Sequence, residues 1–310
     1  MNSITAHSMQ TFGYILLRGL FRLFGRLPLG FHYAVGRGIS WLADNVIRYR
    51  RDVVVTNIAR SFPDKKYNEL KVIRKQFYRH FGEIFAETVW FCGCSDPKRL
   101  RGSHIVEYTN PEELNRVYDA SPSVMLLTSH AGNWELTGGF VSYSYKEPVH
   151  VAENDVCVVY RKLHSKTWDE LMRKNRITPI VDKAHYEGPV ESEEIMRYVV
   201  RHRNDRKLYY FITDQFPYRG SSRIDVGDFL HQPTLSMDGG AKLAHKFGMG
   251  VVYMNMVPVA RGRYEITFTT ICDDASSMDP EDIMRNYYKL LQSDVEAAPH
   301  NWLWSHKRWK

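Results

Sequence analysis

Cysteine is scarce in this sequence, and no long uncharged apolar run occurs in it. The 310 residues contain four cysteines, too few and too scattered for the disulfide framework of a small secreted domain. We therefore expect all four to be reduced thiols in a cytosolic environment. Cys92 and Cys94 lack the second pair of ligands that a structural zinc site needs. The lack of an uncharged apolar run of about 18 residues disfavours a simple transmembrane span.

The short motifs of several enzyme classes are also missing. The sequence has no P-loop, no Gly-x-Gly-x-x-Gly after a predicted strand, and no Gly-x-Ser-x-Gly nucleophile elbow. None of the 13 histidines lies in a His-Glu-x-x-His arrangement, so we expect neither a metal site nor a cofactor. The N-terminus lacks the basic start, apolar core and cleavage site of a secretory signal.

The chain does have an ordinary globular composition and an excess of positive charge. Hydrophobic residues make up 44% and charged residues 25% of a chain long enough to bury a sizeable core. The net charge of +7 favours an acidic partner, such as nucleic acid, anionic lipid, a phosphorylated substrate or an acidic carrier protein. Nucleic-acid binding would explain the charge but not the apolar N-terminal stretch, so we expect no nucleic-acid partner.

The first third of the sequence predicts helices. Residues 12–42 are strongly apolar, yet Arg18, Arg22 and Arg26 recur every four positions and would line one side of a helix. Such a helix can lie in a membrane interface with its arginines toward the headgroups, or it can cover the core of the protein itself. The pattern leaves both alternatives open. A second, longer helix is predicted over 65–91, and we assign residues 1–95 to a helical, membrane-associating region.

From residue 96 onward, short apolar runs alternate with helical patterns. This alternation predicts an α/β domain over 96–310, with a mostly parallel or mixed sheet flanked by helices. The expected strands are 105–108, 124–128, 156–160, 178–181, 208–213, 250–256 and 264–271. The expected helices are 111–118, 134–145, 165–175, 192–202, 235–247 and 280–298.

Polar residues follow three of the predicted strands. His130 and Glu135 come after the strand at 124–128, Arg161 after the next one, and Asp214 with Gln215 after the strand at 208–213. Ligands collect at the carboxyl ends of parallel strands. We therefore expect these three clusters to converge on one cleft.

The spacing of His130 and Glu135 suggests a specific geometry. On one helix they would point about 140° apart, but they can meet if His130 lies in a turn and Glu135 in the first helical turn, with Asn133 as N-cap. Glu135 would then accept one imidazole N–H and leave the other ring nitrogen as a base. Backbone N–H groups near Gly132 would be available to stabilise an oxyanion. The alternative is a His and a Glu that merely cap a helix.

The C-terminus ends in an aromatic and basic segment. Three tryptophans stand beside His306, Lys307 and Arg308 within residues 301–310. This pattern predicts a docked segment whose aromatic rings pack and whose basic groups face an anion.

These residues together resemble the lipid A biosynthesis lauroyl/myristoyl (late) acyltransferases, within the His-x4-Asp/Glu lysophospholipid acyltransferase superfamily. The Pro-Glu-Gly-Thr-type block of the broader glycerolipid acyltransferases is missing, and the acidic residue of the motif is Glu, which both favour the lipid A branch. The resemblance rests on Arg50-Arg51, Phe62-Pro63, His130-Ala-Gly-Asn-Trp-Glu135, Tyr160-Arg161, Asp214-Gln215, Pro233-Thr234 and Trp302-Leu-Trp-Ser-His-Lys-Arg-Trp-Lys310.

The resemblance implies a glycerolipid acyltransferase-like fold and a reaction at the cytoplasmic face of the inner membrane. A fatty acyl group would pass from acyl carrier protein to a hydroxyl of a lipid A precursor, with no cofactor and no covalent enzyme intermediate. His130 would be the general base and Glu135 would assist it. The residues expected to bind substrate are Asn133, Arg161, Asp214 and Gln215.

Three alternatives stay open at this point. The acceptor could be another lipid, such as a lysophospholipid or an amino-acid lipid. The chain could also be a non-catalytic membrane-binding protein of the same fold, although the intact His130 and Glu135 argue against that. A hydrolase that uses Ser129 is disfavoured, because the sequence has no nucleophile elbow.

Overall fold

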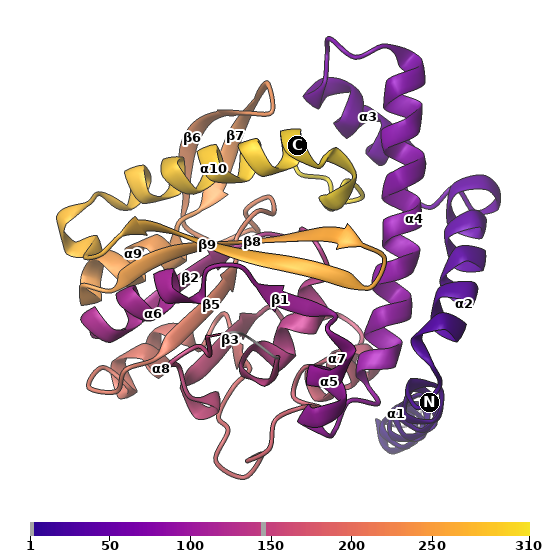
Figure 1. Cartoon of the computed structure of the whole chain (residues 1–310), viewed down its shortest axis with the longest axis horizontal. Helices are drawn as coiled ribbons and strands as arrows, with labels where there is room; N and C mark the ends of the chain where they lie inside the picture. Colours follow the sequence, from indigo (N-terminus) through magenta and orange to yellow (C-terminus); the bar gives the residue numbers. More distant parts are fainter. Residues whose placement is uncertain (1–2, 144–146) are drawn as a thin grey trace.

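The centre of the molecule is a mixed β-sheet, seen in a computed structural model that describes residues 3–143 and 147–310 (Figure 1). The strands lie in the order β1-β9-β8-β2-β5-β3-β4, and β8 and β9 are antiparallel whereas the other neighbouring pairs are parallel. The sheet strands are β1 (Val106–Tyr108), β2 (Val124–Thr128), β3 (Val156–Tyr160), β4 (Val190–Glu191), β5 (Leu208–Ile212), β8 (Gly250–Ala260) and β9 (Arg263–Cys272). A separate antiparallel hairpin consists of β6 (Arg223–Phe229) and β7 (Gln232–Met237).

Strand β2 shows why the sheet is covered on both faces. Val124 and Leu126 belong to one apolar core cluster, and Met125 and Leu127 belong to the other. All four side chains are fully buried. Because alternate residues of a strand point to opposite faces, a strand buried on both faces reads as a continuous apolar run.

Helices cover both faces of this sheet. The helices of the α/β region are α5 (Pro97–Ser103), α6 (Pro111–Ala120), α7 (Lys166–Arg176), α8 (Ile195–Arg201), α9 (Gly239–Phe247) and α10 (Pro280–Ala297). Four short segments are 3-10 helices: η2 (Trp134–Ser142), η3 (Glu153–Asp155), η4 (Ala275–Ser277) and η5 (Pro299–Asn301).

The N-terminal helices lie together on one side of the sheet, at the right of Figure 1. They are α1 (Ser3–Gly25), α2 (Leu29–Trp41), the π-helical turn η1 (Leu42–Val46), α3 (Arg51–Ser61) and the long α4 (Tyr67–Phe91). Val54 and Ile58 of α3 and Phe77 of α4 belong to the same core cluster as Met125 of β2. Helix α4 also lies beside the turn that follows β2, because Nε2 of His80 is 3.3 Å from the Gly132 carbonyl oxygen.

The predicted α/β architecture with a mostly parallel mixed sheet is confirmed, but the structure differs from the local predictions in several places. Residues 178–181 form turns after α7 and not a strand. The helix expected over 235–247 begins at Gly239, because the residues before it pair as β7. The hairpin was not predicted, since exposed Asp and Arg side chains interrupt the apolar alternation of β6. The helix expected over 134–145 is the 3-10 helix η2 as far as Ser142, and residues 144–145 lie outside the described residues.

Within residues 3–143 and 147–310, no helix is both long enough and apolar enough to span a bilayer. Helix α1 contacts α4 and α7, and the Phe21 ring lies edge-on to Trp168 of α7. Several other apolar side chains of α1 are exposed, among them Leu16, Leu20 and Leu23. Membrane association of this region stays a prediction.

Candidate active site

His130 lies in a tight turn between β2 and η2. Strand β2 ends at Thr128 and η2 begins at Trp134, so the predicted placement of His130 in a strand-end turn and of Glu135 in the first helical turn is confirmed. Gly132 makes this turn possible, because its φ of 63° favours glycine. A Cβ at this position would also lie 2.6 Å from Cγ of Met256.

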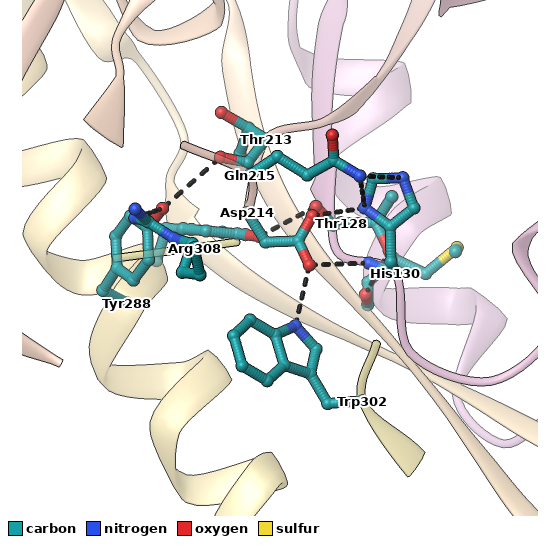
Figure 2. Close-up of polar contacts among 10 residues, drawn as sticks. Thr128, His130, Thr213, Asp214, Gln215, Tyr288, Trp302 and Arg308 are labelled. Atoms are coloured by element: carbon teal, nitrogen blue, oxygen red, sulfur yellow. Dashed lines mark hydrogen bonds and ion pairs between the residues drawn. The ribbon is translucent and has the colours of Figure 1, made fainter. Parts of the chain in front are cut away.

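The partner of His130 is Asp214, which follows β5 (Figure 2). Nδ1 of His130 lies 2.6 Å from Oδ1 of Asp214, and the backbone N–H of His130 donates to Oδ2 at 3.0 Å. Strand register explains the meeting. Thr128 pairs with Ile212 in the parallel ladder of β2 and β5, so the second residue after each strand end reaches the same place.

The predicted hydrogen bond between Glu135 and His130 is not formed, so this prediction is wrong. Both carboxylate oxygens of Glu135 accept from Arg176 at the end of α7, at 2.9 Å from Nε and 2.7 Å from Nη2. Asn133 is the N-cap as predicted, because its side-chain oxygen accepts from the backbone N–H of Glu135. Asn133 therefore caps the start of η2, and the Glu135 side chain points toward α7. The carboxylate beside His130 is that of Asp214, which follows the neighbouring strand β5.

Asp214 is held in its ionised form. Its side chain is 2% exposed, and burial alone would raise its pKa. The charge of His130, together with the hydrogen bonds that His130 and Trp302 donate, outweighs burial and holds the pKa of Asp214 below its usual value. A carboxylate that accepts Nδ1–H fixes the tautomer in which Nε2 of the neutral imidazole carries the lone pair.

Nε2 of His130 contacts Gln215, whereas Nδ1 pairs with Asp214. The His130 side chain is 16% exposed, and the Gln215 amide nitrogen lies 3.1 Å from Nε2. Figure 2 shows the Gln215 side chain reaching the imidazole with its terminal amide. The Trp134 ring packs edge-on against the imidazole at 5.0 Å between centroids. The nitrogen suited to act as a base is therefore the one that an incoming hydroxyl could reach if Gln215 moved.

Arg161 lies where the sequence places it, after β3, the other neighbour of β5. Strands β2, β5 and β3 are adjacent, so the prediction that the three polar clusters follow neighbouring strands is confirmed. Arg161 is exposed, and its guanidinium lies over the Tyr218 ring at 4.3 Å. Its charge is available to a ligand from solution.

Two expectations about the turn need correction. Asn133 is fully buried, and its amide donates to Glu87 and to the Ile84 carbonyl, so the structure gives it a positioning role and not the predicted contact with substrate. The backbone N–H of Gly132 donates to Oδ1 of Asn301 at 2.8 Å. It is therefore engaged in the fold and is not an open oxyanion donor.

Glu87 of α4 supports the site by accepting a hydrogen bond from Asn133, and no sequence motif predicted this role. It is fully buried and accepts hydrogen bonds from Tyr33 at 2.7 Å, Tyr264 at 2.8 Å and Asn133 at 2.9 Å. Despite these donors, burial raises the pKa of Glu87 to about 7. An acidic residue among Ile84, Ala86, Val89 and Trp90 of a predicted helix is the signal that would have found it.

We expect Glu87→Gln to change how stability depends on pH. The folded protein favours the protonated form of Glu87, so its stabilising contribution is complete below pH 4.5 and is lost as pH rises to about 7. At about 1.4 kcal/mol per pKa unit, the loss is about 3 kcal/mol. Glutamine cannot ionise, so the free energy of unfolding of the variant relative to the wild type should rise by that amount over this range.

Urea unfolding at several pH values between about 5 and 8 measures this difference. Glu193→Gln, which alters an exposed carboxylate, is the matched control and should show no such trend. Parallel pH profiles for the wild type and Glu87→Gln would contradict the assignment of a buried, protonatable Glu87.

Within the described parts of the chain, no group of three or more His, Cys, Asp or Glu side chains is placed to hold a metal ion.

In a comparison with known proteins, the family model described as bacterial lipid A biosynthesis acyltransferase matches residues 3–310. These residues include the N-terminal helices, the His130 turn and the C-terminal segment. A search of curated proteins finds no match. This family implies an acyl donor and a lipid A precursor as acceptor. The chain therefore belongs to the bacterial lipid A biosynthesis acyltransferase family and is an acyltransferase.

Proposed function

We propose that this protein transfers a fatty acyl group from acyl carrier protein to a hydroxyl of a lipid A precursor, with His130 as the general base. The observation that carries the proposal is the His130–Asp214 pair, in which Nδ1 is 2.6 Å from a buried carboxylate and the His130 side chain is itself 16% exposed. A base held by an acidic partner is the arrangement that activates a hydroxyl nucleophile.

The reaction proceeds by direct attack. Nε2 of His130 removes the proton of the acceptor hydroxyl as its oxygen bonds to the thioester carbonyl carbon. The C–S bond then breaks, and the imidazolium returns its proton to the departing thiolate. Asp214 stabilises the imidazolium through Nδ1–H. General base catalysis of this kind contributes about 10² to 10⁴-fold to the rate.

The side chains proposed to contact the substrate are the partly or fully exposed Gln215 and Arg161. Gln215 occupies the space beside Nε2, so its amide moves aside when the acceptor hydroxyl enters. Arg161 binds a phosphate of the acceptor through its planar guanidinium. Glu135 acts indirectly, without contact with the substrate. Its hydrogen bonds to Arg176 fix the start of η2 next to the turn that carries His130.

The positive charge of the protein favours an anionic acyl donor. A net charge of +7 favours an acidic carrier protein over a neutral donor, and it also favours an anionic membrane. Coenzyme A carries phosphates as well, so the two thioester donors need a direct comparison.

The N-terminal helices dock on the cytoplasmic face of the inner membrane. Apolar side chains of α1 that would be buried if it only covered the protein core are exposed instead, which favours the interfacial alternative. A surface hollow at the start of α3 is lined by Arg48, Arg51, Asp52, Val55 and Thr56, and its arginines add positive charge to the N-terminal helices. The exposed apolar side chains of residues 15–55, here called the docking face, are Ile15, Leu16, Leu20, Leu23, Phe24, Phe31, Val35, Trp41, Leu42, Val46, Ile47, Tyr49 and Val55.

The test is acyl transfer by the purified protein on vesicles that contain a lipid A precursor, lysophospholipid and an amino-acid lipid. Acyl carrier protein and coenzyme A thioesters are supplied in separate reactions, and the lipids are analysed by mass spectrometry. We expect one acyl chain to be added to the lipid A precursor, from the carrier protein, and His130→Ala to abolish the addition. Acylation of one of the other lipids alone would overturn the acceptor. Vesicle binding without any transfer would favour the non-catalytic alternative.

A further inference from the structure

We propose that Trp302, one residue of the C-terminal segment, is a positioning residue of the His130–Asp214 pair. The inference rests on the proposed function, because the orientation of Asp214 matters to the reaction only if His130 is the base. Trp302 lies 88 residues from Asp214 in the sequence, and the two meet only in the folded protein.

The indole N–H of Trp302 decides how the two carboxylate oxygens of Asp214 are used. It donates to Oδ2 at 2.7 Å, and the backbone N–H of His130 donates to the same oxygen. Oδ1 is thereby left to accept Nδ1–H of the imidazole (Figure 2). Trp302 is 3% exposed and Asp214 is 2% exposed, so solvent cannot readily replace this donor.

Asn301 supports the same turn from the adjacent position. Its Oδ1 accepts from the backbone N–H of Gly132, and its amide donates to the Met256 carbonyl, both at 2.8 Å. An isolated antiparallel β-bridge joins Ala131 to Trp302. Asn301 and Trp302 thus hold Ala131 and Gly132, which follow His130 in the turn. Trp302 also holds the Asp214 carboxylate.

The C-terminal segment is itself clamped to the N-terminal helices. Asn57 of α3 donates to the carbonyl oxygens of Trp304 and His306, and Arg50 donates to that of Ser305. The Trp302 ring packs edge-on against Trp304 at 4.8 Å between centroids. These contacts dock the C-terminal segment against the N-terminal helices.

The segment also supplies its own controls. The indole N–H of Trp304 donates to the Pro299 carbonyl, and that of Trp309 donates to Oγ1 of Thr234. All three tryptophans donate a hydrogen bond, but their acceptors differ, and the bond from Trp302 is to the carboxylate of the pair. Replacement of each by Phe removes one N–H while keeping an aromatic ring.

We expect Trp302→Phe to lower kcat about 10- to 100-fold, since a buried hydrogen bond to a charged group is lost. KM should change little. The acidic limb of the kcat–pH profile should also move to higher pH, because Asp214 without this donor holds a proton within the pair more tightly. A merely structural role would reduce the amount of folded enzyme without moving that limb.

The experiment compares Trp302→Phe, Trp304→Phe, Trp309→Phe and His130→Ala in the full-length protein on vesicles, with kcat expressed per folded molecule. If Trp302→Phe does not fold, the benzothiophene isostere at position 302 removes the N–H and keeps the shape. Equal kcat and an unmoved acidic limb for the 302 and 304 variants would overturn the inference. An active His130→Ala enzyme would instead overturn the proposed function, so the two failures are distinguishable.

Discussion

Asp214→Asn should lower kcat by about three to four orders of magnitude while the protein remains folded. The asparagine oxygen would keep the donors of Trp302 and the His130 backbone, and its amide would then face Nδ1. The asparagine N–H would donate a hydrogen bond to Nδ1, so the imidazole proton would move to Nε2. Nε2 would then have no lone pair with which to act as a base. The loss expected from the wrong tautomer is about 10⁴-fold.

Single-turnover acyl transfer at saturating substrate measures this loss, and circular dichroism reports the folded state. Asp205→Asn is the matched control, because Asp205 also pairs with a histidine, His202, at 2.8 Å but lies before β5 and not after it. The control should keep wild-type activity. If Asp214→Asn keeps more than about a tenth of the wild-type kcat, the assigned partner of His130 is wrong.

Removing apolar side chains from the docking face should release the protein from membranes. Leu20 and Phe24 are both exposed on α1, so the double variant Leu20→Ser with Phe24→Ser should fold normally. Burying a side chain of this kind stabilises by about 1.5 to 3 kcal/mol. The partition coefficient onto vesicles should therefore fall about 100-fold or more.

Sedimentation with vesicles of phosphatidylethanolamine and phosphatidylglycerol measures this partition. The control removes two similarly exposed apolar side chains from α8, in Met196→Ser with Val200→Ser, and should bind as the wild type does. Equal binding of the two double variants would contradict the docking face. The effect of added salt separates the contribution of Arg18, Arg22 and Arg26, because attraction between exposed charges is screened.

The sequence by itself determined the framework and the place of the site. Strands β2 and β3 have the predicted bounds, because a strand buried on both faces must be apolar throughout and ends where polar residues begin. For the same reason, the clusters at His130, Arg161 and Asp214 could be placed at strand ends that share one edge of the sheet. The cap at Asn133 is a local interaction, and the sequence predicted it correctly.

Only the tertiary structure decided which of these groups meet. Spacing along the chain pointed to Glu135 as the partner of His130, whereas the partner is Asp214, 84 residues away. The register that pairs Thr128 with Ile212 brings them together, and such a register is set by packing between distant strands. The roles of buried Glu87 and of the Trp302 indole N–H are likewise visible only in the tertiary structure. Each is a polar group whose desolvation is offset by partners from other elements, and the fold alone brings these partners within hydrogen-bonding distance.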